Sequence, residues 1–259
     1  MPGSSRRRPN GRRANRRRDA GVEPTREGGL LVVAGLELEA RGLLRRLPPA
    51  TRRALTVRTV GLRATLLQRL DAPFPSREPT ALLVTGLAGG CGPGLRPGDV
   101  VVGDPVATPG VELDGDGGDP GLRRRAIRAL DAAQLRYRVG RLLTVDEVVT
   151  SPVAKAQWWR TQGVLAVDME SAHVLAWARR AGLPALAVRA VVDGPQDEVP
   201  RDLLGVVGRD GRMRAGAVVA LLGRPALVGA ALRLGQRSRQ ALGSLARFVR
   251  AFVDLSSEP

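Results

Sequence analysis

Four acidic residues stand where strand-like apolar segments of the sequence end or where the next helix begins. Asp168 and Glu170 follow the apolar run 164–167, Asp193 ends "ALAVRAVVD", and Glu39 lies in "AGLELEARGLL" just after another apolar run. Ligands of open α/β sheets bind at the carboxyl ends of the strands. Carboxyl groups gathered there can accept hydrogen bonds, donate a proton or activate water. We therefore expect these acids to contribute to one site.

Each of these acids also has an ordinary structural explanation. The helix dipole favours Glu37 and Glu39 in a first helical turn. An acid that follows a strand, as Asp193 does, is common as a turn or N-cap residue. Taken one at a time, these positions leave the structural and the chemical explanation open.

A glycine-rich bend follows the strand-like segment Ala81–Thr85. The stretch "TGLAGGCGPG" contains Gly86, Gly89 and Gly90, and glycines after a strand let backbone N–H groups approach a ligand closely. The bend lacks the Lys-Ser/Thr ending of a nucleotide-binding P-loop, and its spacing differs from the dinucleotide-binding pattern. It supports a ligand site without defining the ligand.

The elements that would position these residues follow an α/β pattern. Continuous Val-, Leu- and Ala-rich segments alternate with helical periodicity, which is typical of a mostly parallel sheet covered by helices on both faces. We expect a three-layer α/β/α domain with a central, mostly parallel (mixed) sheet. The expected strands are Leu30–Ala34, Ala81–Thr85, Val100–Val102, Leu142–Val145, Val164–Val167 and Ala185–Val192, and the expected helices are Glu37–Leu47, Leu122–Leu135, Pro152–Thr161 and Ser171–Ala181.

The net charge of +16 is concentrated at the two ends of the 259-residue chain. Residues 1–28 are rich in arginine and lack apolar periodicity, so we expect a disordered tail there, either simply solvated or in contact with the phosphates of nucleic acid or membrane. A catalytic domain is expected over 29–205 and basic C-terminal helices over 206–259. Lys155 is the only lysine, and so strong a preference for arginine fits a GC-rich coding bias.

The C-terminal segment repeats apolar residues at helical spacing. This stripe could close the domain as a packed helix pair, or it could form a basic amphipathic surface for a membrane. No apolar run approaches the ~20 residues of a membrane-spanning helix, no apolar segment typical of a secretory signal follows the first arginines, and a single cysteine fits the reducing cytoplasm. The stripe consists of Leu227, Ala231, Leu234, Ala241, Leu245, Phe248 and Phe252, with Arg233, Arg237, Arg247 and Arg250 around it.

Four motifs together resemble the nucleoside phosphorylase and nucleosidase superfamily. They are "AGLELE", "TGLAGG", "AVDMES" and "AVRAVVD", and they occur in the order and spacing of that family. The resemblance covers about residues 30–200. It is greatest to the subgroup of hopanoid-biosynthesis-associated phosphorylases, through "LTVDEVVTSPVAKAQWWRTQGVLAVDMES", "DGPQDEVP" and the Arg-rich C-terminal helices.

This resemblance implies a role for each motif. The family's glutamate in "MES", here Glu170, accepts hydrogen bonds from the ribose 2′- and 3′-hydroxyls, and Met169 packs against the sugar. Asp193 is implied as the general acid that protonates the departing purine, and Glu39 as the base that activates water. The further substrate-binding residues implied are Ala88, Gly89, Val148 and Val149, the last two through their backbone at the edge of the base.

Two positions depart from the family pattern. Val148 stands where related nucleosidases have a phenylalanine, which weakens the expected stacking on the purine. Val192 stands where a small polar residue commonly orients the acid, so Asp193 is expected to have a different partner. Asp168 is expected to shape the turn before the helix.

The reaction implied is cleavage of an N-ribosidic bond without a cofactor. Glu37 and Glu39 stand where phosphorylases bind phosphate, and carboxylates repel a phosphate, so hydrolysis is favoured. If the reaction is phosphorolytic instead, inorganic phosphate is the co-substrate, and Arg41 and Arg63 are candidate ligands. No Cys/His cluster in the sequence indicates a metal site.

Resemblance to the subgroup implies that the substrate is adenosylhopane, a nucleoside-lipid, from which adenine is released to leave ribosylhopane. The expected partners are this substrate, a second copy of the chain and the inner face of the membrane through the C-terminal arginines; nucleic acid is not expected. The alternative is a non-catalytic basic protein that binds nucleic acid or membrane on the same fold. That alternative predicts loss of the acids, whereas Glu39, Glu170 and Asp193 are all present.

Overall fold

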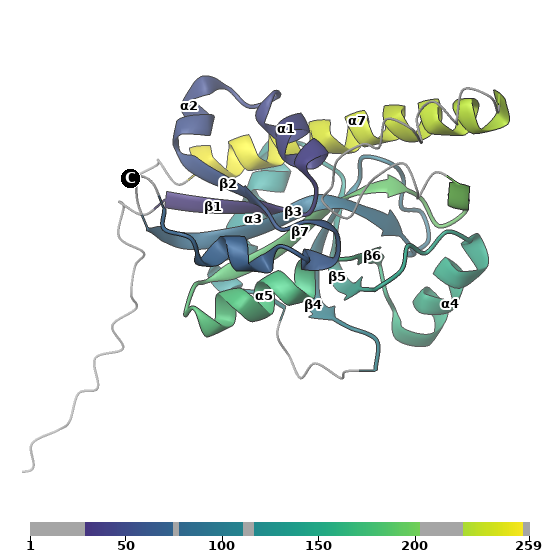
Figure 1. Cartoon of the computed structure of the whole chain (residues 1–259), viewed down its shortest axis with the longest axis horizontal. Helices are drawn as coiled ribbons and strands as arrows, with labels where there is room; N and C mark the ends of the chain where they lie inside the picture. The colour runs from purple at the N-terminus through teal and green to yellow at the C-terminus, as the bar shows by residue number, and fades with distance from the viewer. Residues whose placement is uncertain (1–28, 75–77, 111–116, 203–224, 256–259) are drawn as a thin grey trace, which may run out of the picture.

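The fold consists of a twisted sheet between two layers of helices. The computed structural model describes residues 29–74, 78–110, 117–202 and 225–255. Figure 1 shows helices α1 (Glu37–Leu44) and α7 (Pro225–Asp254) over one face of the sheet and α5 (Ser171–Arg180) over the other. The expected three-layer α/β/α architecture is confirmed.

Seven described strands form the sheet, in the order β2-β1-β3-β6-β5-β4-β7. Five of the pairings are parallel, and the pairings β3–β6 and β4–β7 are antiparallel, so the sheet is mixed and mostly parallel as expected. The strands are β1 (Gly29–Ala34), β2 (Leu55–Thr59), β3 (Pro79–Gly90), β4 (Val100–Ala107), β5 (Tyr137–Thr144), β6 (Ala166–Asp168) and β7 (Ala185–Asp193).

Strand β3 changes its partner along its length. Residues 82–89 pair with β7, whereas Gly89 and Gly90 pair with Val167 and Ala166 of β6. Because β7 also pairs with β4, the strands β3, β6, β5, β4 and β7 close into a ring. This closure brings the carboxyl end of β3 next to the ends of β6 and β7, which bear the acidic residues.

Two apolar cores lie on opposite faces of the sheet. One is built from α1, α3 (Pro120–Ala132) and α7 against β1, β3, β4 and β7, and the other from α5 and the 3₁₀ turns η1 (Leu62–Ala64) and η2 (Leu67–Asp71). Alternating residues of β1 illustrate the division, because Leu30 and Val32 face the first core and Leu31 and Val33 face the second. A strand buried on both faces reads as a continuous apolar run.

Helix α4 (Pro152–Gln162) has well-defined ends. The Ser151 side chain accepts a hydrogen bond from the backbone N–H of Ala154 (3.2 Å), and proline occupies the first turn, where its missing N–H costs nothing. Gly163 ends the helix with φ of 64°, a left-handed conformation that favours glycine. These caps define both ends of the helix that carries Lys155.

The expected helices and strands are present, with shifted ends, and a few short elements occur in addition. Strand β2 was not expected, since "LTVRT" is a short edge strand whose residues are all only half-buried. The short helix α2 (Pro49–Arg53) precedes it. The expected tail over residues 1–28 lies outside the described residues, as does the segment 203–224.

The C-terminal stripe is divided between two environments. Ala241, Leu245, Phe248 and Phe252 are at most 1% exposed and belong to the core, so this half of the stripe closes the domain. Nothing between residues 227 and 240 is buried. The buried apolar residues of the stripe therefore lie in the C-terminal half of α7, and its apolar residues Leu227, Ala231 and Leu234 are at least partly exposed.

Candidate active site

A buried arginine organises the first of two clusters of charged side chains. Arg189 of β7 is fully buried, and its guanidinium lies 2.6 Å from the Asp168 carboxylate and 3.4 Å from that of Glu170. It also donates to the Ser171 hydroxyl (3.0 Å) and to the Thr85 carbonyl (3.3 Å). Buried charges persist in a fold only where they are paired and hydrogen-bonded. Arg189 therefore ties the end of β6 and the start of α5 to β3 and β7.

Glu170 is held by groups from two other elements. Its Oε1 accepts a hydrogen bond from the Arg63 backbone N–H (3.2 Å), and Oε2 faces Arg189. Arg63 reaches this position because it adopts φ of 56°, and Ala64 follows with φ of 53°, a strained conformation for residues other than glycine. Burial raises the pKa of Glu170 to about 8, opposed by Arg189. The carboxyl group is thus fixed in a dry site from which it can bind a polar ligand.

Glu39 lies in the first turn of α1 and is almost completely buried. Its Oε2 accepts from the Leu36 backbone N–H (3.0 Å), and its Oε1 accepts from the Leu87 backbone N–H of β3 (2.8 Å). The first bond caps the helix, as the structural explanation predicted, whereas the second crosses 48 residues of sequence and aims the carboxylate at the sheet. Burial raises the pKa of Glu39, and the positive charge of Arg189 opposes this rise. A base with a raised pKa is well matched to proton transfer near neutral pH.

Two glycines make room for these carboxyl groups. A Cβ atom at Gly35 would lie 2.8 Å from the Glu170 carboxyl carbon, and one at Gly86 would overlap an Arg189 guanidinium nitrogen and lie 3.1 Å from Glu39. Gly86 also has φ of 149°, which side-chain-bearing residues rarely adopt. The glycine-rich bend therefore lets β3 pass close to the charged cluster.

The second cluster surrounds Asp193 at the end of β7. Asp193 Oδ2 accepts a buried hydrogen bond from the ammonium of Lys155, which is fully buried on α4. The same ammonium donates to the carbonyls of Gly194 (3.0 Å) and Asp197 (2.7 Å). Burial raises the pKa of Asp193, and the charge of Lys155 opposes the rise. The expectation that Asp193 has a partner other than residue 192 is confirmed, and the partner is Lys155.

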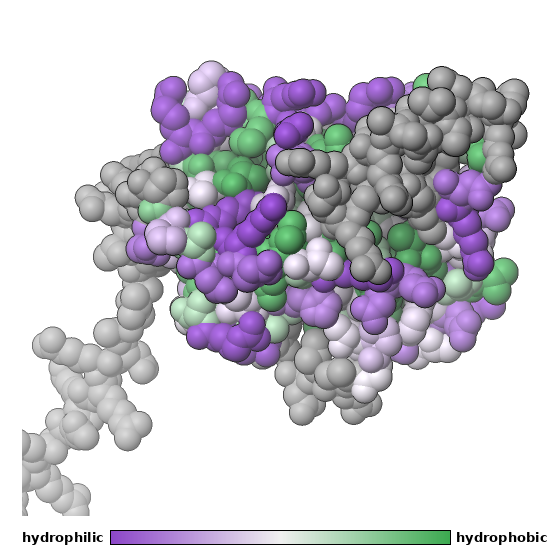
Figure 2. Space-filling view, in the orientation of Figure 1, coloured by the Kyte–Doolittle hydropathy of each residue, from purple (hydrophilic) through white to green (hydrophobic). Residues whose placement is uncertain are grey.

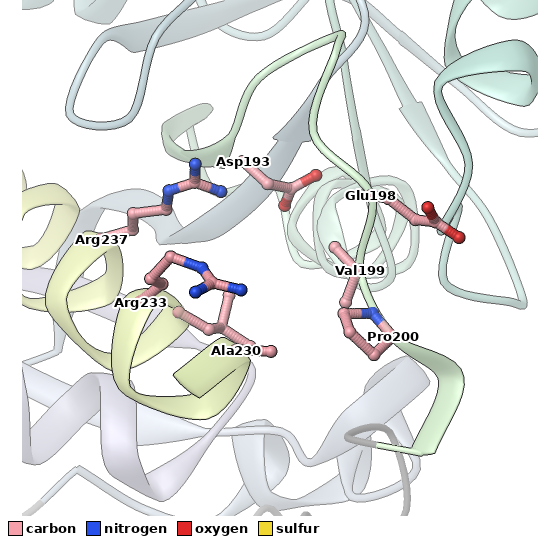
Figure 3. A pocket seen from close by; sticks show the side chains of 8 residues that line it. Asp193, Glu198, Val199, Pro200, Ala230, Arg233 and Arg237 are labelled. Carbon is pink, nitrogen blue, oxygen red and sulfur yellow. The ribbon is translucent and has the colours of Figure 1, made fainter. Parts of the chain in front are cut away.

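A pocket opens from Asp193 toward α7. Figure 3 shows Arg233 and Arg237 reaching into it from α7, opposite Val199 and Pro200 of the segment that follows β7. Arg237 is paired with Asp197 (2.8 Å). A ligand in this pocket would therefore meet both the acid and positively charged side chains.

The other substrate-binding residues implied by the sequence lie between or beside the two clusters. Gly89 is the register partner of Asp193, and a Cβ atom on it would lie 3.5 Å from Asp193 Oδ2; Ala88 precedes it, buried, on β3. Met169 is buried between Asp168 and Glu170. These positions place all three at the meeting point of β3, β6 and β7.

Val148 and Val149 lie in the segment between β5 and α4. That segment is joined to the chain after Asp193 by the bond from the Val199 N–H to the Thr150 carbonyl (2.9 Å). Val149 packs against the core, whereas Val148 is 40% exposed. Val148 offers a smaller apolar surface at this position than a phenylalanine would.

Asp168 shapes the turn before α5, as predicted, and it also binds Arg189. It accepts from the Ser171 N–H (3.1 Å) and from the Thr144 hydroxyl (2.6 Å). Sequence reasoning did not single out Arg189 or assign a role to Lys155. The one feature of the sequence that could have drawn attention to Lys155 is that it is the only lysine in a chain with many arginines. Arg189 carried a weaker signal, as a charge inside an apolar strand.

Phosphate and metal ligands are limited in the described part of the chain. Arg41 is paired with Glu37 (3.2 Å) at an exposed position, and the contact described for Arg63 comes from its backbone. Within residues 29–74, 78–110, 117–202 and 225–255, no group of three or more His, Cys, Asp and Glu side chains could hold a metal ion. The helices in these ranges include none long and apolar enough to cross a membrane.

Solved structures with a similar fold include three nucleosidases from bacteria. The 5′-methylthioadenosine/S-adenosylhomocysteine nucleosidase of Neisseria meningitidis has a TM-score of 0.61 and 18% identity, covering 87% of this chain and 99% of that one. The S-adenosylhomocysteine nucleosidase of Streptococcus pyogenes has a TM-score of 0.60 and 21% identity, covering 92% and 100%. The futalosine hydrolase of Helicobacter pylori has a TM-score of 0.60 and 14% identity, covering 88% and 98%. At these identities the likeness establishes the fold.

Family membership follows from the sequence match. The family model described as the Phosphorylase superfamily matches residues 60–222, which is more than half of the chain. No curated protein sequence matches the chain significantly. The chain belongs to the Phosphorylase superfamily, in agreement with the resemblance of its four motifs.

Proposed function

We propose that the protein hydrolyses the N-ribosidic bond of a 5′-substituted adenosine and releases adenine. The observation that carries the proposal is the placement of Glu39 and Asp193 along one strand, β3. Glu39 is bonded to the Leu87 N–H, and Asp193 lies beside Gly89, two residues further on. Two strand residues span about 7 Å. The two acids are therefore held at neighbouring points along β3, where an acid and a base can act on one bound substrate.

The three acids divide the chemistry. Asp193 donates its proton to the purine as the C–N bond breaks and the bonding electrons pass to the base. Glu170 accepts hydrogen bonds from the ribose hydroxyls and stabilises the cationic sugar. Glu39 takes a proton from water, whose oxygen forms the new bond to the sugar carbon. Each proton transfer contributes typically ~10²–10⁴-fold to the rate.

Hydrolysis is favoured over phosphorolysis by the charges around Glu39. Glu39 and Asp168, together with Glu170 when it is ionised, share the buried cation Arg189, so a phosphate dianion there would meet an excess of negative charge. Arg41, one of the two candidate phosphate ligands, is occupied by Glu37. Water, being neutral, carries no such penalty.

The substrate we propose within this class is adenosylhopane, on the strength of the subgroup resemblance. Purified protein is incubated with adenosine, methylthioadenosine and adenosylhopane in detergent, and free adenine is measured. We expect kcat/KM for adenosylhopane to exceed that for adenosine at least ~10-fold, since binding of a remote substituent can be used to lower the barrier. A higher kcat/KM for methylthioadenosine would show that the preferred substrate carries a small 5′-substituent and not a lipid. Absence of adenine release from all three compounds would contradict the enzyme class.

We further propose that the N-terminal half of α7 contacts an anionic membrane, where a hopanoid substrate would reside. Leu232 is 67% exposed, and Arg233 and Arg239 are exposed beside it. Elsewhere on the surface, hydrophilic residues dominate the region over α1 and α2 (Figure 2). Basic residues near an anionic surface contribute about 1 kcal/mol each.

The membrane proposal is tested by sedimentation of the full chain with phosphatidylglycerol vesicles. We expect Arg233→Gln/Arg239→Gln to weaken binding at least ~10-fold at low salt. The control Arg52→Gln/Arg53→Gln removes the same charge from exposed positions of α2 and should bind within about threefold of wild type, by additivity of remote charges. Equal losses in both variants would mean that only net charge matters, and would contradict a contact through α7.

A further inference from the structure

Lys155 is the most completely enclosed cation next to the proposed acid. Its side chain is fully buried, and its three N–H donors meet the Asp193 carboxylate and the carbonyls of Gly194 and Asp197. An ammonium has three donors and no acceptor, so these partners account for its whole hydrogen-bonding capacity. The caps of α4 fix the helix that holds it. Both the charge and the direction of this side chain are therefore set by the fold.

The three contacts of Lys155 also fix the chain around Asp193. The two carbonyls belong to the turn after β7, which is closed by a bond from the Gly194 N–H to the Asp197 side chain (2.8 Å). Lys155 donates to Oδ2 of Asp193, so Oδ1 is the oxygen of this carboxyl group that the ammonium does not bind. Arginine, with a planar fork of donors, cannot reproduce this three-way contact of a compact ammonium.

We infer that Lys155 is a positioning residue for the proposed general acid: it turns Asp193 toward the substrate and stabilises the carboxylate that remains once the proton has been given up. The inference rests on the proposed function, in which Asp193 protonates the purine. In each turnover Asp193 loses one proton to the base, and its carboxylate then forms an ion pair with the ammonium of Lys155. A proton from solvent water restores the acid after the products leave.

Other charged groups face Asp193 from the elements packed around it. Asp197, on the turn after β7, raises the pKa of Asp193, and Arg237 on α7 lowers it, but both effects are smaller than that of Lys155. Glu198 and Arg233 line the adjoining pocket. Cys91 is buried nearby, and its pKa is raised to about 12 by burial, so this thiol stays neutral in the working range.

Removal of the lysine charge has a defined effect on pH dependence. Burial would then raise the pKa of Asp193 with less opposition, so the acid would stay protonated to higher pH. Loss of activity at alkaline pH marks deprotonation of a general acid. In Lys155→Met the alkaline limb of the kcat profile should therefore move to higher pH, while kcat at its maximum falls because Asp193 is no longer oriented. A lysine needed only for folding would lower the amount of active protein without moving the limb.

The experiment measures kcat and KM against pH for adenine release by the full chain with Lys155→Met and Lys155→Arg. We expect Lys155→Met to move the alkaline limb up by at least ~1 pH unit, to lower maximal kcat at least ~10-fold, and to change KM less than about threefold. Lys155→Arg keeps the charge, so its limb should stay within ~0.3 units of wild type while kcat falls. An unmoved limb in Lys155→Met, or an upward shift in Lys155→Arg, would overturn the inference. If Lys155→Met does not fold, the inference is judged on whether the alkaline limb of Lys155→Arg stays at the wild-type pH.

A parallel Asp193→Asn measurement separates this inference from the proposed function. If Asp193→Asn keeps turnover within about threefold of wild type, the acid assignment itself fails. If Asp193→Asn is inactive while Lys155→Met has the wild-type profile, only the role of Lys155 fails.

Discussion

The Asp193→Asn variant is expected to release adenine at least ~10²-fold more slowly than the wild-type protein, with KM changed less than about threefold. Asparagine has the shape of aspartic acid and can still accept the hydrogen bond from Lys155, so the site should keep its form. Its amide cannot supply an acidic proton to the departing purine. The loss should therefore fall on kcat, which is measured by adenine release at substrate saturation.

The Asp193 result needs a control for removal of a buried carboxylate. Asp99→Asn provides it, because Asp99 is buried and its carboxylate accepts from the Arg96 N–H (3.0 Å), outside both clusters. This control should keep kcat within about threefold of wild type. Equal losses in the two variants would point to a general effect on the fold, and near-normal turnover in Asp193→Asn would remove Asp193 from the role of acid.

The Glu39→Gln variant is expected to slow hydrolysis at least ~10²-fold, because the amide cannot take a proton from water. Its oxygen can still accept from one of the two backbone N–H groups, of Leu36 or Leu87, that now bind the carboxylate. Substrate binding through Glu170 should persist. The measurement is single-turnover adenine release, with KM determined in parallel.

Glu37→Gln is the matched control for Glu39. Glu37 lies in the same helical turn and pairs with Arg41 at the surface, so its loss should leave turnover within about threefold of wild type. Wild-type turnover by Glu39→Gln would assign water activation to another group. Restored turnover of Glu39→Gln by added phosphate would indicate phosphorolysis.

The fold was largely predictable from the sequence because strands that are buried on both faces appear as continuous apolar runs. β1 and β7 are buried on both faces and appear as "LLVVA" and "ALAVRAVV". β2 lacks such a run, since its residues are half-buried at the sheet edge and alternate with Arg58 and the threonines. The change of partner along β3 depends on the register between distant strands, which apolar patterning alone does not specify.

The candidate site was predictable where a motif combined residue type with position. Glu39, Glu170 and Asp193 stand at element ends, and the structure gives each of them buried surroundings. Lys155 and Arg189 lie within elements, and their importance arises from tertiary contacts to residues 38 and 19–21 positions away. Helical or strand periodicity carries no information about such pairings.

The most direct test of the account is the identity of the sugar product with and without phosphate. The wild-type protein and the best of its three candidate substrates are incubated in both buffers, and the products are identified by mass spectrometry. Hydrolysis with Glu39 as base and Asp193 as acid predicts adenine and a free 5′-substituted ribose at the same rate in each buffer. Adenine release that requires phosphate, with the sugar recovered as its 1-phosphate, would contradict it.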